Sequence, residues 1–109
     1  MHKSVTLLFA GAIALAGSNL YAQKGDAAKG KDVFEGNCSV CHNSDSAEVK
    51  MGPGFKGLFK KAKMSTTGKV PTDANVLAKV NEGGNGMPAY KDILSAEEKA
   101  DVIAFLKTL

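Results

Sequence analysis

The sequence predicts an all-α fold of three to four helices joined by long loops. Three segments repeat apolar residues at helical spacing, and each is bounded by residues that typically begin or end helices. No stretch alternates apolar and polar residues well enough to indicate a strand. The length of 109 residues allows one domain, and a charged fraction of 23% is ordinary for a globular protein.

The first 22 residues have the pattern of a secretory signal peptide. A short basic start precedes an apolar run over residues 5–16, and the segment that follows ends in the small residue Ala22. An uncleaved membrane anchor is disfavoured, because a span needs about 20 apolar residues and Ser18 and Asn19 interrupt the run. We therefore expect cleavage after Ala22, export of the chain and no stable membrane insertion afterwards.

Cleavage leaves a domain over residues 23–109, with Ala16 as the alternative cleavage position. All 14 basic residues of the chain are lysines, and 13 of them stay in this domain beside 11 acidic residues, for a net charge of +2. The lack of Arg disfavours sequence-specific recognition of nucleic acid, and two cysteines are too few for a disulfide-based scaffold. A domain of 87 residues with five aromatic residues is near the size at which a metal or cofactor often supplements the core.

The first helix is expected to begin at Asp26, because a carboxylate suits both the N-cap position and the positive end of a helix. The residues that follow at helical spacing form one face. That face holds Gly30, Val33, Phe34, Asn37, Cys38 and Cys41. The small size of Gly30 indicates that another element packs closely against this helix.

Two more helices are expected further along the chain. One begins near residues 72–73 and ends at residues 83–84, where glycine can take the left-handed conformation of a helix C-cap. The other begins at Ser95, which is expected to form a capping box with Glu98. The apolar stripe of the former is Val76, Leu77 and Val80, and that of the latter is Val102, Phe105, Leu106 and Leu109.

Two loops are long for so small a domain. Residues 43–71 are expected to hold at most a short turn at residues 55–59, and residues 83–90 contain three glycines and one proline. Loops of the first length are uncommon in small domains unless they have a function. We therefore expect both loops to pack their apolar residues onto a cofactor.

The segment Cys38-Ser39-Val40-Cys41-His42 carries the chemistry. Two thiols at this spacing can add to the two vinyl groups of haem, and the adjacent imidazole can bind the iron as an axial ligand. A dithiol redox motif is disfavoured because no β-α unit is visible, and a zinc site because it needs four ligands. A structural disulfide would leave His42 without a role. The pattern therefore predicts one covalently bound haem c.

The second axial ligand of the iron is expected to be Met87. It stands between Gly86 and Pro88, in a loop free to approach the opposite face of the haem, and a thioether is a suitable iron ligand. Met51 is expected to pack on the proximal side, and Met64 to be a surface or loop-packing residue in a lysine-rich stretch. An open or lysine-ligated site is the alternative.

Four segments resemble, in the same order, the class I cytochromes c of the bacterial periplasmic type. They are Gly30 with Phe34 just before Cys38, residues 52–59, residues 86–90 and residues 101–106. The resemblance covers nearly all of residues 25–109 and implies a small cytochrome c fold in which the last helix crosses the first. It also implies that the carbonyl oxygen of Pro53 accepts a hydrogen bond from His42.

An apolar shell is expected around the haem. It consists of Phe34, Val40, Phe55, Leu58, Phe59, Tyr90 and Phe105. Imidazole and thioether ligands leave no open coordination position, which suits electron transfer better than chemistry on O₂ or peroxide. We expect a periplasmic single-electron carrier, not an enzyme, that serves redox proteins such as a terminal oxidase or a bc-type complex. The alternatives are a component of a respiratory or oxidising enzyme complex, and a haem sensor or peroxidase-like protein with a labile sixth ligand.

Six lysines and no acidic residue lie between Val49 and Thr72. This basic segment comprises Lys50, Lys56, Lys60, Lys61, Lys63 and Lys69. A basic surface can steer an acidic redox partner. The alternative is a solvated loop whose charges only maintain solubility.

Overall fold

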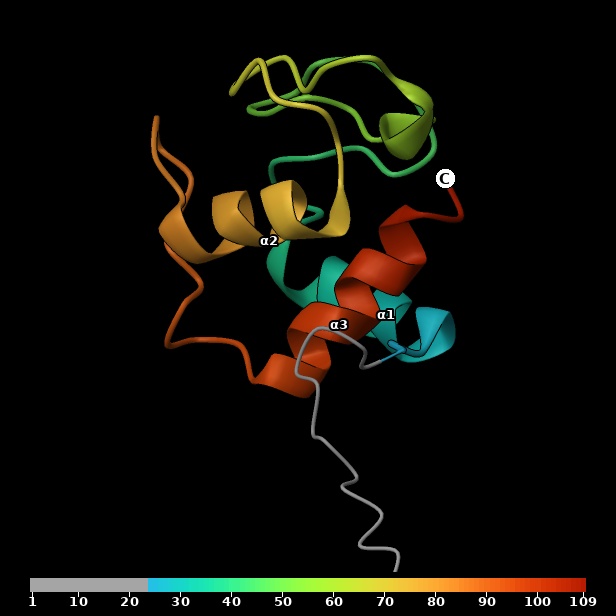
Figure 1. Ribbon diagram of the computed structural model, residues 1–109, viewed down its shortest axis with the longest axis vertical. Coiled ribbons are helices and arrows are strands. Elements are labelled where there is room, and N and C mark those ends of the chain that lie inside the picture. Colours follow the sequence, from blue (N-terminus) through green and yellow to red (C-terminus); the bar gives the residue numbers. More distant parts are fainter. Residues whose placement is uncertain (1–23) are drawn as a thin grey trace, which may run out of the picture.

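The predicted helices all form in the computed structural model of the chain, which describes residues 24–109 (Figure 1). They are α1 (Ala27–Asn37), the short 3-10 helix η2 (Leu58–Lys60), α2 (Asp73–Glu82) and α3 (Ala96–Leu106). Within the described residues there is no strand, only an isolated bridge between Gly84 and Met87. The prediction of a signal peptide concerns residues 1–22, which lie outside the described part of the chain.

The three α-helices begin where the sequence predicts. The Asp26 carboxylate accepts hydrogen bonds from two main-chain N–H groups of the first turn of α1, at 2.9 and 3.2 Å. The Thr72 hydroxyl accepts one at the start of α2, at 3.1 Å. Ser95 and Glu98 form the predicted capping box of α3, with two reciprocal hydrogen bonds of 3.0 Å. Such caps satisfy N–H groups that have no partner inside the helix.

Helix α3 packs directly across α1 (Figure 1), and the contact is closest at Gly30. A methyl group at this position would overlap the main-chain carbonyl of Asp101 and approach the β-carbon of Phe105 to 2.9 Å. Beside this contact, the rings of Phe34 and Phe105 lie 5.5 Å apart, centroid to centroid, at 52°. The prediction that Gly30 marks the close approach of another element is confirmed.

A buried carboxylate joins the beginning of α1 to α3. Asp101 is 6% exposed, and its Oδ1 accepts a hydrogen bond of 2.7 Å from the N–H of Asp26. The chain also runs close to α3 at Gly25, where a side chain would collide with the main chain of Ala100 and Asp101. A buried charged group needs such a partner, because burial without one is costly. The start of α1 is therefore fixed on α3 by polar as well as apolar contacts.

One apolar core joins the helices to the long loop. Its buried members are Phe34, Leu58, Met64, Val76, Val102, Ile103 and Leu106. The expectation that Met64 is a surface or loop-packing residue is corrected in part, because it is 7% exposed and belongs to this core. A turn closed by hydrogen bonds from Met64 N–H to Lys69 O, at 2.8 Å, and from Gly68 N–H to Met64 O, at 2.9 Å, fixes its backbone.

Helix α2 and the long loop lie on the same side of the crossed α1–α3 pair (Figure 1). An exposed ion pair of 2.6 Å between Lys107 and Asp73 links the end of α3 to the start of α2. None of the helices within residues 24–109 is both long enough and apolar enough to cross a membrane. This arrangement leaves apolar surface of all three helices facing the loop.

Substitution of Gly30 tests the helix contact. We expect Gly30→Ala to lower the free energy of unfolding of the haem-loaded protein by about 1–3 kcal/mol, because the added methyl group overpacks the α1–α3 contact. Gly36→Ala is the matched control, since Gly36 lies in the same helix and has no atom within 4 Å of the added carbon. It should raise the free energy of unfolding by up to about 1 kcal/mol through helix propensity. Urea unfolding followed by circular dichroism measures both, and equal effects would contradict the packing argument.

Candidate functional site

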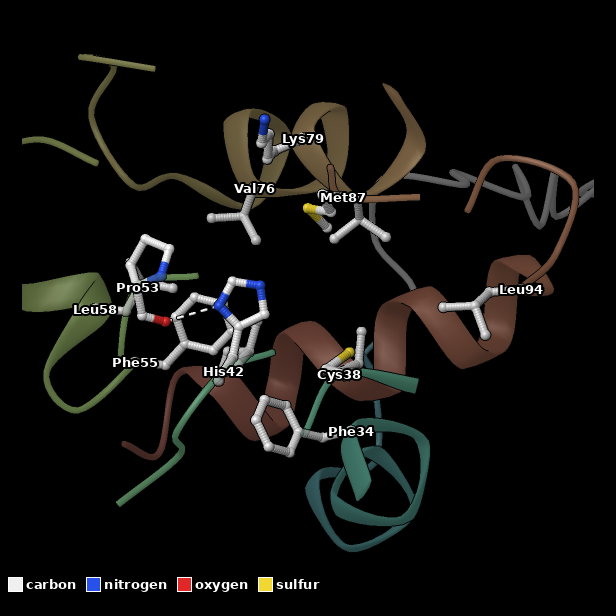
Figure 2. Close-up of a pocket in the computed structure, with 13 residues that line it drawn as sticks. Phe34, Cys38, His42, Pro53, Phe55, Leu58, Val76, Lys79, Met87 and Leu94 are labelled. Carbon is white, nitrogen blue, oxygen red and sulfur yellow. Dashed lines mark hydrogen bonds between the residues drawn. The ribbon is translucent and has the colours of Figure 1, made fainter. Parts of the chain in front are cut away.

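A cavity of about 650 Å³, part of it open to solvent, lies between the helices and the long loop (Figure 2). Its walls come from the end of α1, the loop that follows, α2, the loop between α2 and α3, and α3. The lining residues are Phe34, Cys38, His42, Pro53, Phe55, Leu58, Val76, Lys79, Val80, Met87, Leu94, Val102 and Leu106. Nearly all of them are apolar, so the cavity suits a large, flat and mainly apolar group.

Seven of the predicted site residues meet in this cavity. They are Phe34, Cys38, His42, Pro53, Phe55, Leu58 and Met87. These residues span more than 50 positions of the sequence, and the fold brings them to one place. Five other predicted residues are not in the lining, namely Val40, Cys41, Phe59, Tyr90 and Phe105.

The two cysteines lie on a turn that continues α1. The N–H of Cys38 donates to Phe34 O at 2.7 Å, and those of Cys41 and His42 donate to Cys38 O at 3.1 and 3.0 Å. Both thiols are free. Burial, with a smaller contribution from Cys41, raises the pKa of Cys38 to about 11. Cys38 is therefore a neutral thiol at neutral pH, as its apolar surroundings require.

The orientation of the His42 ring is fixed by two contacts, and a glycine makes room for it on a third side. Its Nδ1 lies 2.7 Å from the carbonyl oxygen of Pro53, and because a carbonyl can only accept, Nδ1 carries the proton and Nε2 is left as a free lone pair. The ring stacks on Phe55 at 4.3 Å, with 18° between the planes. Gly52 leaves the third side free, since a β-carbon there would lie 2.8 Å from Nδ1. The result is an imidazole prepared to bind a metal through Nε2.

Met87 lies on the α2 side of the cavity, across from His42 (Figure 2). It ends a tight turn in which Gly84 N–H donates to Met87 O at 2.9 Å and Met87 N–H donates to Gly84 O at 3.1 Å. All four residues from 83 to 86 have positive φ angles, and three of them are glycines. Glycine adopts this backbone region readily, so the turn that presents the thioether depends on the glycine-rich sequence.

Tyr90 lies outside the lining and fixes the Met87 loop in place. Its hydroxyl donates to the carbonyl oxygen of Asn37, the last residue of α1, at 2.8 Å, and its N–H donates to Val80 O at 2.9 Å. Partial burial, followed by the charges of Cys38 and Cys41, raises the pKa of the Tyr90 hydroxyl. The hydroxyl therefore stays protonated at neutral pH and can donate this hydrogen bond.

The expectation that Val40 belongs to the apolar shell is corrected by its position. Its side chain is 73% exposed, because Cys38 and His42 face the cavity and Val40 lies on the outer side of the turn between them. The expectation that Met51 packs on the proximal side is corrected as well, since Met51 is 79% exposed, with its Sδ 3.8 Å from Cys41 Sγ.

The two remaining phenylalanines support the cavity from behind. Phe105 packs on Phe34 from α3. Phe59 is half-buried against the core, with the Lys107 ammonium 5.8 Å from its ring centroid. Neither is in the lining of this cavity, where Phe34 and Leu58 stand at the wall, and their place in a haem shell stays a prediction.

Lys79 and Leu94 also line the cavity, and neither was predicted to do so. Lys79 is three residues after Val76 on α2, so helical spacing could have identified it. Leu94 precedes the capping box of α3 and carries no periodic signal. Among the described residues no group of three or more His, Cys, Asp and Glu side chains could hold a metal ion by itself. The two thiols, the free Nε2 of His42, the thioether and the apolar wall together fit a haem.

Comparisons with known proteins agree with this geometry. A family model described as cytochrome c oxidase, cbb3-type, subunit III matches residues 25–106. Cytochrome c6 of Synechocystis sp. is 31% identical over 100 residues, which cover 92% of this chain and 78% of that protein. Cytochrome c6 of Leptolyngbya boryana is 36% identical over 81 residues, with coverage of 74% and 89%. The solved structure of cytochrome c6 from the diatom Phaeodactylum tricornutum has a TM-score of 0.61 at 32% identity, covering 77% of this chain and 93% of that one.

Removal of the Tyr90 hydroxyl tests its part in fixing the Met87 loop. We expect Tyr90→Phe to lower the free energy of unfolding by about 1 kcal/mol, since the Asn37 carbonyl loses a part-buried hydrogen bond. Thr108→Val removes an exposed bond of the same type, from a hydroxyl to Phe105 O, and should change the stability less. Thermal unfolding monitored in the haem absorption band compares the two variants, and a Tyr90→Phe variant as stable as the wild type would rule out this role.

Proposed function

This chain belongs to the cytochrome c family, as a small class I member with one covalently bound haem c, and on that premise we propose that it is a periplasmic single-electron carrier with His42 and Met87 as axial ligands. The family assignment confirms the predicted small all-α cytochrome c fold and the haem c cofactor. It also confirms the prediction of an electron carrier rather than an enzyme. The export signal that the sequence predicts over residues 1–22 supports the periplasmic location.

The chain is proposed to hold its cofactor through two thioether bonds. Cys38 and Cys41 supply the sulfurs, three residues apart on one turn after α1. The haem supplies a one-electron couple of its iron. The protein attaches it, orients it and keeps water from it with an apolar wall, which favours the reduced state.

The observation that carries the ligand assignment is the pairing of His42 with Pro53 opposite Met87. The hydrogen bond of 2.7 Å to Pro53 O directs the His42 lone pair away from the loop, and Met87 stands on the other wall (Figure 2). An imidazole and a thioether on opposite faces leave no position for an exchangeable ligand. This supports electron transfer over the sensor or peroxidase-like alternative.

Electrons are proposed to leave at the Cys41 side of the site. Three apolar residues of the Cys41 turn and of the segment bonded to it are each more than 70% exposed, namely Val40, Val49 and Met51. The hydrogen bond of 2.8 Å from Gly52 N–H to Cys41 O holds the Met51 segment against the motif. Exposed apolar patches commonly mark interaction sites, and a small one suits a brief encounter with a redox protein.

The basic segment is proposed to steer partners towards this surface. All six of its lysines are exposed. Within residues 24–109 the two ion pairs, Lys29–Glu97 and Lys107–Asp73, involve none of them. Unpaired surface charges of one sign accelerate association with an oppositely charged partner. The expected partner surface is therefore acidic around an apolar centre.

A second candidate function is a subunit held permanently in an oxidase complex. The family model that matches residues 25–106 is named for subunit III of a cbb3-type oxidase, which favours this candidate. The cytochrome c6 relatives, which align along most of their length, favour a separate carrier. Size-exclusion chromatography of a periplasmic extract separates the two candidates. A free carrier elutes at the size of this chain, whereas a subunit elutes with the complex.

Substitution of Met87 tests the proposed function. We expect the ferric wild-type protein to show a far-red sulfur-to-iron charge-transfer band. The ferrous protein should not bind carbon monoxide, because both axial positions are filled. Met87→Leu should lose the band, bind carbon monoxide and have a lower reduction potential. Met51→Leu, at a methionine that is 79% exposed, should retain all three wild-type properties. Absorption spectroscopy decides, and a persistent band in Met87→Leu would contradict the ligand assignment.

Charge reversal at Lys50 tests the exit surface. Lys50 lies beside the Cys41 turn, where its Nζ donates to Ser39 O at 3.1 Å. We expect Lys50→Glu to slow oxidation by the anionic probe hexacyanoferrate(III) by about three- to tenfold at low ionic strength, and the effect should shrink in high salt. Lys99→Glu is the matched control, since Lys99 makes the same type of bond, to Lys91 O, on α3. Stopped-flow rates that fall equally in both variants would show that the exit lies elsewhere.

A further inference from the structure

Lys79 is the one cationic side chain in the cavity lining. The other ionisable members are His42, which binds metals as a neutral imidazole, and Cys38, which is a neutral thiol before haem attachment and would be an uncharged thioether after it. Lys79 comes from α2, on the same wall as Val76 and Met87 (Figure 2). A charged group beside an otherwise apolar site is costly to bury unless it has a polar partner.

The ammonium of Lys79 is fixed at the start of the Met87 turn. The main-chain carbonyl of Lys79 accepts from Gly83 N–H at 2.8 Å, and its Nζ donates back to Gly83 O at 3.0 Å. Gly83 itself lies so close to this turn that a β-carbon there would collide with the carbonyl of Met87. The positive charge is therefore held next to the distal loop instead of extending freely into solvent.

No carboxylate neutralises this charge within the described chain. The ion pairs of residues 24–109 are Lys29–Glu97 and Lys107–Asp73, and the only partner of the Lys79 ammonium is a carbonyl oxygen. Lys79 is half-buried, so salt screens its field less than that of a fully exposed lysine. A nearby positive charge disfavours the oxidised state of an iron centre, because oxidation adds a positive charge.

We propose that Lys79 sets the reduction potential of the haem, by holding an uncompensated positive charge beside the Met87 turn. This inference rests on the proposed function, in which Met87 is an axial ligand. Lys79 acts through its field and its position, and it takes no part in binding the iron. It raises the potential and so favours acceptance of an electron.

The test compares three haem-loaded variants with the wild type by spectroelectrochemical titration. Lys79→Gln removes the charge and keeps a hydrogen-bond donor, while Lys79→Arg keeps both. Lys99→Gln is the matched control, because Lys99 also donates to a main-chain carbonyl, at 2.8 Å, and lies outside the cavity. The equilibrium constant for reduction should fall about threefold in Lys79→Gln, which is about 28 mV at 59 mV per tenfold change. It should change by less than about 1.3-fold in the other two variants.

The far-red band is recorded on the same samples and separates the possible causes. A lower potential in Lys79→Gln with the band intact supports the proposal, because the ligands are unchanged. Equal potentials in Lys79→Gln and Lys99→Gln would overturn it, and so would a lower potential accompanied by loss of the band. If the wild type itself lacks the band, the assignment of Met87 fails, and the comparison of potentials still decides the role of the charge.

Discussion

The close approach of α1 to α3 at Gly30 determines where the rest of the site lies. Because α1 leads directly into the two cysteines, its packing on α3 fixes Cys38 and His42 over the floor that α3 supplies through Val102 and Leu106. Only a residue without a side chain allows this distance. The hydrogen bond from Asp26 to the buried Asp101 secures the other end of α1. The positions of the site residues therefore depend on the contact between α1 and α3.

The His42 side and the Met87 side of the site are held in different ways. On the His42 side the ring is held by the hydrogen bond to Pro53, which selects one tautomer, and by stacking on Phe55, while Gly52 leaves room for it. On the Met87 side a flexible glycine-rich turn is held by bonds to its surroundings, above all the Tyr90 hydroxyl on α1. In the proposed carrier, a firmly held imidazole would face a thioether on a more adaptable turn, which would suit a centre that changes charge without changing its coordination.

The sequence predicted the features that depend on helical periodicity and on hydrogen bonds between residues close in the chain. The three helices begin at Asp26, Thr72 and Ser95 as expected, because caps are local. The cysteine–histidine motif is local as well. The direction of a loop side chain is set by distant partners, which periodicity does not contain, and so Val40 and Met51 were expected inside and lie outside.

The run of positive φ angles over residues 83–86 also bears on how firmly the two faces of the site are held. Glycines lose more conformational freedom on folding than other residues, so ordering the turn before Met87 costs more backbone entropy than ordering an equal length of helix. Segments with a small net free energy of ordering open more readily than packed helices. For the proposed carrier this implies that Met87 would be released from its place more readily than His42, which Pro53 and Phe55 hold.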